Sequence, residues 1–135
     1  MSLTGDLITY ILNDETIQGL INDNLFDMFV PEDTPFPFCV FERDAMMIED
    51  HLLDITALRK SDYSLTIAGE NSIQTEAVEE AFITLLASVR GVIGNSNVRV
   101  IYYNGSEETS LQPVDGSEES TDLITMRFEV HWFKS

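Results

Sequence analysis

Side chains that could carry out chemistry are few and poorly clustered in this sequence, which has two histidines and one cysteine in 135 residues. The segment Glu49-Asp50-His51, with Asp54 three residues after the histidine, could present His51 and a carboxylate on one face of a helix. A metal site, however, needs three or four converging ligands and a supporting shell of hydrogen bonds. We therefore interpret the segment as a solvated run of charges and expect no metal site.

The other candidate sites are also incomplete. The segment Asp115-Gly116-Ser117-Glu118-Glu119 is acidic but lacks the residue order and the glutamate spacing of a calcium-binding EF-hand loop. Cys39 lies in an apolar run, which favours a buried thiol over a nucleophile. His131 falls beside Glu129 and Arg127, and acid–base catalysis would also need a pocket and a positioned partner. We expect no catalytic residue and no cofactor, with an unfamiliar carboxylate site as the enzymatic alternative.

The net charge restricts the classes of partner. The chain has 24 acidic and 7 basic residues, a formal net charge of −17 and a pI of about 4.1. Such a surface repels phosphate groups, so we expect neither nucleic-acid nor membrane binding through basic patches. Tyr102-Tyr103 could stack on bases, but Arg99 alone does not form the basic groove that accompanies such platforms. The absence of a basic leader segment and of a long apolar run favours a cytosolic protein.

Hydrophobic periodicity predicts helices at the start of the chain. Apolar residues recur at helical spacing over residues 3–27, with a break at Asn13-Asp14-Glu15 and with Ser2 or Thr4 available as the N-cap. Prolines then end the helical segment, and the aromatic and β-branched run at residues 36–43 predicts a strand. A hydrophobic fraction of 44% can fill one core, so we expect a single domain over residues 1–135, its sheet and long helix within 36–133.

The clearest local pattern is a strand followed by a long helix. Alternation at residues 62–68 predicts a strand with one buried face. Asn71 and Gln74 then resemble a capping box, and apolar residues recur every three or four positions. We expect an amphipathic helix over residues 72–90, with Gly91 as its left-handed C-terminal cap.

Two more strands are predicted towards the end of the chain. At residues 98–103 we expect Val98, Val100 and Tyr102 on one face. At residues 124–132 the alternation is the strongest signal in the sequence. The following five apolar residues are expected on one face of that strand: Ile124, Met126, Phe128, Val130 and Trp132.

The remaining segments and the element order complete the predicted fold. Residues 104–121 are polar and predict a solvated connection. Residues 44–61 are too apolar for a plain loop but follow neither the helical nor the strand period, and we interpret them as an extended arm or a short helix. The long helix makes the strands on either side of it parallel in direction, and the last strand fits between them. We therefore predict an α+β fold whose four-stranded, mostly antiparallel sheet has the order 1-2-4-3. The N-terminal helices and the long amphipathic helix pack on one face.

This pattern resembles the phage tail-completion proteins of the siphovirus tail-terminator and head–tail joining group. The resemblance lies in an early helix, the Pro-aromatic strand at 35–41, the strand at 62–68 leading into a helix at 76–88, and the aromatic strand at 126–133. It covers most of the chain. The resemblance implies a structural protein without catalytic residues. It also implies self-association into a ring, which would be hexameric as in the similar proteins.

The same resemblance implies partners and a location. The partners would be tail-tube and connector proteins, and the location would be the host cytoplasm during assembly and then the tail or neck of the virion. Terminator and head-proximal joining roles both fit. The charge agrees with this function, because a carboxylate-rich lumen would not hold DNA through phosphate contacts.

The segment at residues 46–58 is a candidate subunit interface, because it contains many apolar residues but has no core periodicity. An equally good interpretation is that it covers the core of its own chain. Its apolar residues are Met46, Met47, Ile48, Leu52, Leu53, Ile55 and Leu58.

The alternative function is an acidic inhibitor, of the immunity or DNA-mimic type, which binds a basic toxin or nuclease. An inhibitor predicts carboxylates in one contiguous patch, whereas a ring subunit predicts charge spread over lumen and loops.

Overall fold

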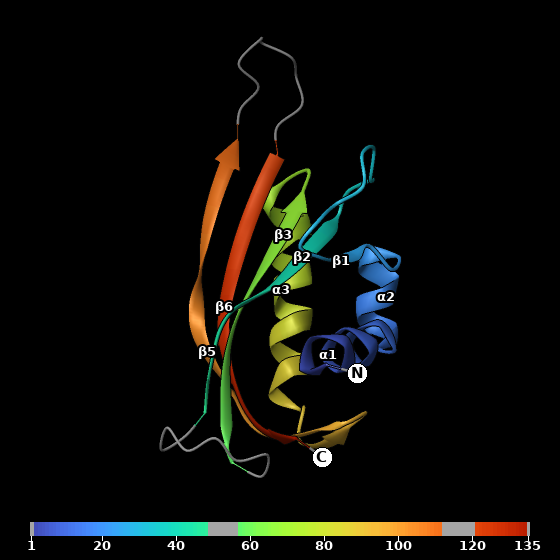
Figure 1. The fold of residues 1–135 in the computed structure, drawn as a ribbon. Helices are drawn as coiled ribbons and strands as arrows, with labels where there is room; N and C mark the ends of the chain where they lie inside the picture. The colour runs from blue at the N-terminus through green and yellow to red at the C-terminus, as the bar shows by residue number, and fades with distance from the viewer. Residues whose placement is uncertain (1, 49–56, 112–120, 135) are drawn as a thin grey trace.

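The computed structural model describes residues 2–48, 57–111 and 121–134, which form three helices and six strands (Figure 1). The helices are α1 (Leu3–Leu12), α2 (Glu15–Ile21) and α3 (Ser72–Ala87). The strands are β1 (Leu25–Asp27), β2 (Phe38–Ile48), β3 (Arg59–Gly69), β4 (Gly91–Ile93), β5 (Ser96–Leu111) and β6 (Thr121–Lys134).

Side-chain caps fix the starts of the helices. Ser2 caps α1 by accepting a hydrogen bond from the Gly5 N–H, and the Asn71 side chain accepts one from the Gln74 N–H at 2.9 Å. Gln74 in turn accepts from the backbone N–H of Glu70 at 2.8 Å, so both predicted N-caps are confirmed. The predicted C-terminal cap is wrong: α3 ends at Ala87, and Gly91 uses its positive φ of 88° at the start of β4.

The sheet has six strands in the order β1-β2-β3-β6-β5-β4, not four. The four predicted strands do occupy the predicted order, and the neighbours among them are antiparallel. The two additional strands are three residues each: β1 runs parallel to β2, and β4 antiparallel to β5. Elements this short carry no readable periodicity, and for that reason the helical prediction for residues 3–27 extended wrongly over β1.

Two predicted connections are partly strand. Residues 104–111 belong to β5, and Ser106–Leu111 pair with β6, so the predicted solvated connection is wrong there. Residues 44–48 and 59–61 belong to β2 and β3, and Met46–Ile48 pair with Arg59–Ser61, which fits the extended arm and excludes a helix over those residues. Polar residues form strand at 104–111 because β6 offers a pairing partner, which outweighs weak local propensity.

All three helices lie on one side of the strongly curled sheet (Figure 1). We call this side the covered face and the other the open face. The five predicted apolar residues of β6 are buried on the covered face. The rings of Phe41, Tyr63 and Phe128 pack against one another there at centroid distances from 4.7 to 5.9 Å, and Phe82 of α3 is fully buried with them in the core.

A bulge in β5 changes which residues share a face. Val98 lies opposite Trp132 and is buried, whereas Val100 lies opposite His131 on the open face. The prediction that Val98 and Val100 share a face is therefore wrong, because the extra residue at the bulge reverses the alternation. Ile101 and Tyr103 consequently face α3.

Candidate functional site at two exposed sheet edges

The predicted chemical candidates do not come together in the described residues. Glu49-Asp50-His51, Asp54 and Asp115–Glu119 all lie outside them. Over residues 2–48, 57–111 and 121–134, no group of three His, Cys, Asp or Glu side chains could hold a metal ion. Cys39 is fully buried, and burial raises the pKa of its thiol far above the usual range, as expected for an inert core residue.

His131 lies on the open face, in contact with Glu129 and Tyr102. Its Nε2 is 3.4 Å from Glu129 Oε1, and its ring meets that of Tyr102 edge-on at a centroid distance of 4.9 Å. Arg127 on the same face forms an exposed ion pair with Glu107 at 3.4 Å. The contact of His131 with Tyr102 and that of Arg127 with Glu107 join β6 to β5 and are cross-strand, as predicted, whereas Glu129 lies two residues before His131 on β6 itself. None of these contacts surrounds a cavity.

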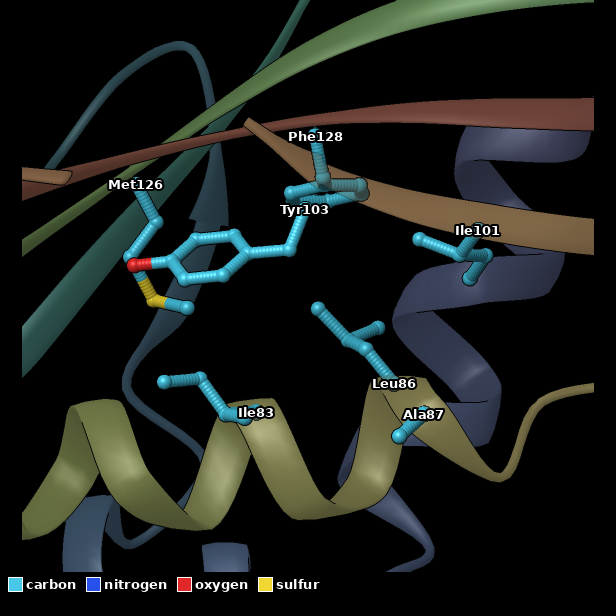
Figure 2. A pocket seen from close by; sticks show the side chains of 7 residues that line it. All are labelled: Ile83, Leu86, Ala87, Ile101, Tyr103, Met126 and Phe128. Carbon is cyan, nitrogen blue, oxygen red and sulfur yellow. The ribbon is translucent and has the colours of Figure 1, made fainter. Parts of the chain in front are cut away.

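An apolar cleft lies between α3 and the sheet (Figure 2). It measures about 90 Å³ and is lined by Ile83, Leu86, Ala87, Ile101, Tyr103, Met126 and Phe128. Figure 2 shows the Tyr103 ring lying along the strand side of the cleft, opposite Ile83. The Tyr103 hydroxyl donates a hydrogen bond to Glu79 at 3.4 Å, and burial raises its pKa. With no other ionisable side chain in its lining, this cleft suits an apolar group better than a reaction.

Two buried carboxylates have structural roles. Asp6 of α1 accepts hydrogen bonds from the Asn95 N–H at 3.1 Å and the Ser96 hydroxyl at 2.7 Å, which fixes the helix to the β4–β5 turn. Asp122 of β6 accepts from the hydroxyl of Thr75 in α3 at 2.5 Å. Both contacts hold helices against the sheet.

The first exposed edge of the sheet is formed by β1 and β2. Strand β1 pairs with residues 39–41 of β2, so among the described residues Glu42–Ile48 has β3 as its one strand partner. Met28 and Phe29, which follow β1, are 60% and 80% exposed. Met46 and Met47 on β2 are 39% and 58% exposed. We call this region the β2 edge.

The opposite edge is formed by β4 and β5. Strand β4 pairs with residues 96–98, so within the described parts of the chain Val100–Leu111 has β6 as its one strand partner. Val92, Tyr102 and Tyr103 are 64%, 51% and 43% exposed. We call this region the β5 edge, and the apolar cleft lies beside it.

The exposed apolar side chains are therefore concentrated on these two edges. Eight large apolar residues are exposed in the part of the chain that the structure describes, and Ile73 in α3 is the one member outside the edges. Unpaired strand edges with exposed apolar side chains are sites of protein association unless they are protected. The described chain thus has two separate apolar edges, one on each side of the sheet.

The predicted interface segment contributes to the β2 edge in part. Met46 and Met47 are exposed, whereas Ile48 and Leu58 are half-buried. Leu52, Leu53 and Ile55 lie outside the described residues. The β5 edge was not predicted, because Tyr102-Tyr103 was interpreted only as a possible base-stacking pair. Its signal was present as two aromatic residues in a strand whose flanking sequence is polar.

Charge is spread over the described chain. Six of the seven basic residues lie in strands and Arg90 immediately precedes β4, whereas the three helices carry acidic residues and no basic ones. Acidic residues occur in every helix, in both connections that flank β1 and in five of the six strands: Asp27, Glu42, Asp44, Asp62, Glu107, Glu108, Asp122 and Glu129. The sheet is thus mixed in charge and the helical side is acidic.

The fold was compared with known proteins. Neither a scan against protein-family models nor a search of curated proteins found a match. Among solved structures, a chain described as "Virion of native gene transfer agent (GTA) particle" superposes with a TM-score of 0.73 and 11% sequence identity. The alignment covers 97% of this chain and 94% of that one. A second solved chain has 13% identity and a TM-score of 0.43, too low to support an argument.

The likeness to the gene transfer agent chain concerns the fold alone at this identity. It spans nearly the whole of both chains, so the helices and the curled sheet are shared rather than one motif. Separately, no helix within the described residues is long and apolar enough to span a bilayer.

Proposed function

We propose that this chain is a structural component of a phage-like virion, and more specifically a tail-completion or head–tail connector subunit that forms a ring. The observation that carries the proposal is the pair of exposed apolar edges on opposite sides of one sheet. Two different surfaces that bind each other form a heterologous contact, and such contacts close into rings when the rotation between subunits allows it.

Two further observations support an assembly role. The fold likeness is to a chain of a virion particle, and it covers nearly all of both chains. The described residues also bring together no catalytic set: the apolar cleft contains a single ionisable side chain, and His131 contacts the Tyr102 ring of β5 and Glu129 of its own strand. A non-enzymatic protein that binds copies of itself and its neighbours in the tail or neck fits these features best.

The alternative, an acidic inhibitor of a basic toxin or nuclease, is less well supported. It predicts carboxylates gathered in one patch, but acidic residues occur on every helix and on most strands, and basic residues are interspersed on the sheet. A binding face for a basic cleft would also be polar, whereas the exposed edges carry methionine, phenylalanine and tyrosine.

The test is assembly with and without the protein. Tail tubes of the particle that encodes this chain are expressed with the wild-type protein or without it and imaged by negative-stain electron microscopy. We expect tubes of defined length, or tails joined to heads, when the protein is present, and tubes of irregular length or unjoined tails when it is absent. Identical tubes and fully joined particles in both samples would contradict the proposal.

A further inference from the structure

We infer that copies of this chain associate by main-chain pairing, with the β2 edge of one copy adding as an antiparallel strand to the β5 edge of the next. The inference rests on the proposed ring function and specifies its contact. The occupant of each edge is thus a second copy of the chain. The open stretches are Glu42–Ile48 on β2 and Val100–Leu111 on β5.

Strand direction favours this pairing. Strands β2, β3, β6 and β5 are neighbours joined by three antiparallel steps, so β2 and β5 run in opposite directions. A copy rotated about an axis roughly parallel to the strands therefore presents its β2 antiparallel to β5 of the first copy. The alternation of strand direction continues across the contact without interruption.

The open stretches also lie at the same level of the sheet. Followed across the strand pairs, Met47 is level with Val100. Met46 is likewise level with Ile101. Strand β1 occupies the β2 edge above this level, and β4 occupies the β5 edge below it (Figure 1). The unpaired part of β2, about 23 Å long at 3.3 Å per residue, thus faces an unpaired part of β5 in a rotated copy.

Side chains on the covered face are complementary at this level. Met46 lies on that face opposite Ser61, and in a rotated copy it reaches the apolar cleft lined by Ile101 and Tyr103 (Figure 2). Contact between the exposed methionine and the apolar cleft of about 90 Å³ would remove apolar surface of both from water, and the flexible methionine side chain can adapt to the shape of the cleft. This match favours pairing of β2 with β5 over pairing of β2 with β2.

A charge pair is placed by the same register. Arg43 is exposed and level with Tyr103, and it makes no ion pair with any described residue. Glu79 of α3 accepts hydrogen bonds from Tyr103 and from Ser106 beside the cleft. The Arg43 guanidinium of one copy would therefore lie near the Glu79 carboxylate of the next.

The main test uses variants that block one edge each. Met46→Glu with Met47→Glu blocks the β2 edge, and Tyr102→Glu with Tyr103→Glu blocks the β5 edge. Sedimentation velocity is measured on each variant alone and on an equimolar mixture, after circular dichroism has shown that each is folded. Ile73→Glu, with the same change in a residue 81% exposed but outside the edges, is the control.

Each blocked variant alone should lose self-association by about tenfold or more relative to the Ile73→Glu control. The mixture should form dimers that do not grow, because each blocked variant retains one functional edge. Self-association by either variant alone at the level of the control would overturn the inference. If the wild-type protein forms rings and both blocked variants still form them, the edge pairing is wrong but the ring function stands. If the wild-type protein does not self-associate, either alone or on tail tubes, both the edge pairing and the ring function are wrong.

Two further variants test the geometry. A Met47→Cys chain mixed with a Val100→Cys chain should form a disulfide-linked heterodimer under oxidising conditions, because paired strand residues lie about 4.5 to 5.5 Å apart. Met47→Cys mixed with Ile73→Cys is the control, and Cys39 is buried and does not interfere. A heterodimer yield equal to that control would overturn the pairing.

The proposed pair of Arg43 and Glu79 predicts a change in association opposite to the one that the net charge predicts. General repulsion between acidic subunits predicts that Glu79→Arg strengthens association, whereas the pair predicts that it weakens association and that Arg43→Glu in the same chain restores it. Stronger association of the Glu79→Arg variant would overturn the assignment of this pair.

Discussion

At the residue scale, Gly94 shows how closely α1 approaches the sheet. Its φ is 58°, and a Cβ atom placed on it would lie 2.2 Å from Oδ1 of Asp6. The same Asp6 carboxylate accepts the hydrogen bonds of Asn95 and Ser96. The glycine therefore allows the turn to wrap around a buried carboxylate.

Replacing Gly94 with alanine should destabilise the protein. We expect Gly94→Ala to lower the free energy of unfolding by about 1–3 kcal/mol, through left-handed backbone strain and overlap with Asp6. Gly19→Ala is the matched control, because Gly19 lies in α2 and a Cβ atom added to it would have no neighbouring atom within 4 Å. It should raise stability by about 0.5–1 kcal/mol. Urea denaturation distinguishes the two, and equal stability of Gly94→Ala and wild type would contradict the contact.

A second residue-scale feature is the pair of carboxyl groups of Glu108, near the end of β5, and Asp122, at the start of β6. A hydrogen bond to Asp122, with smaller contributions from desolvation and from nearby carboxylates, raises the pKa of Glu108 to about 6. Hydrogen bonds from Thr75, Glu108 and Ser110 outweigh desolvation and lower the pKa of Asp122. Glu108 thus donates its proton to an ionised Asp122 in mildly acidic solution.

This pair predicts a pH dependence of stability. Because the folded-state pKa of Glu108 is raised, its contribution is fully present below about pH 4.5 and is lost as the pH rises through about 6. Glu108→Gln keeps a neutral side chain at every pH, so its melting temperature should decline less than that of wild type over this range. Glu107→Gln removes the same charge from the adjacent position and should not flatten the profile. Parallel profiles for Glu108→Gln and wild type would refute the pair.

At the element scale, the start of α3 depends on one cap. We expect Asn71→Ala to lower the free energy of unfolding by about 1 kcal/mol, because the Gln74 N–H loses its acceptor. Ile73→Ala, a change in the same turn at a residue 81% exposed, should alter it far less. Chemical denaturation followed by circular dichroism measures both. A loss for Ile73→Ala as large as for Asn71→Ala would contradict the role of the cap.

Much of the element pattern was predictable because it reflects local periodicity. Strand β6 alternates without interruption, and α3 begins at a readable cap, so their types and most of their bounds follow from the sequence. The order β2-β3-β6-β5 follows from the length of α3 and from right-handed crossover geometry.

What could not be predicted depends on partners distant in sequence. The polar stretch 104–111 is strand because β6 lies beside it, and the faces of β5 depend on bulges that alternation does not reveal. The same limit applies to the candidate site. Met46 and Met47 were identified from unexplained apolar content, but the exposure of Tyr102 and Tyr103 at a sheet edge follows only from the strand pairing of β5.

At the scale of the whole molecule, charge opposes self-association. Each copy carries a formal net charge of −17, so copies repel one another unless short-range contacts and screening offset the repulsion. In the proposed ring, the apolar edges would supply contacts that salt does not weaken.

Salt should therefore promote assembly. We expect the apparent association constant of the wild-type protein to rise between about 0.05 M and about 0.5 M sodium chloride, as screening shortens the range of the repulsion. An acidic inhibitor bound to a basic partner would show the opposite dependence. Sedimentation equilibrium over this range measures the effect, and self-association that weakens steadily with salt would contradict an interface based on apolar edges.

The most direct measurement of the proposed assembly role is a cryo-electron microscopy reconstruction of the phage-like particle that is encoded together with this chain. We predict a closed ring of copies at the end of the tail or in the neck, with β2 of each subunit beside β5 of the next. A particle that lacks the chain, or a ring in which both sheet edges face solvent, would contradict the account.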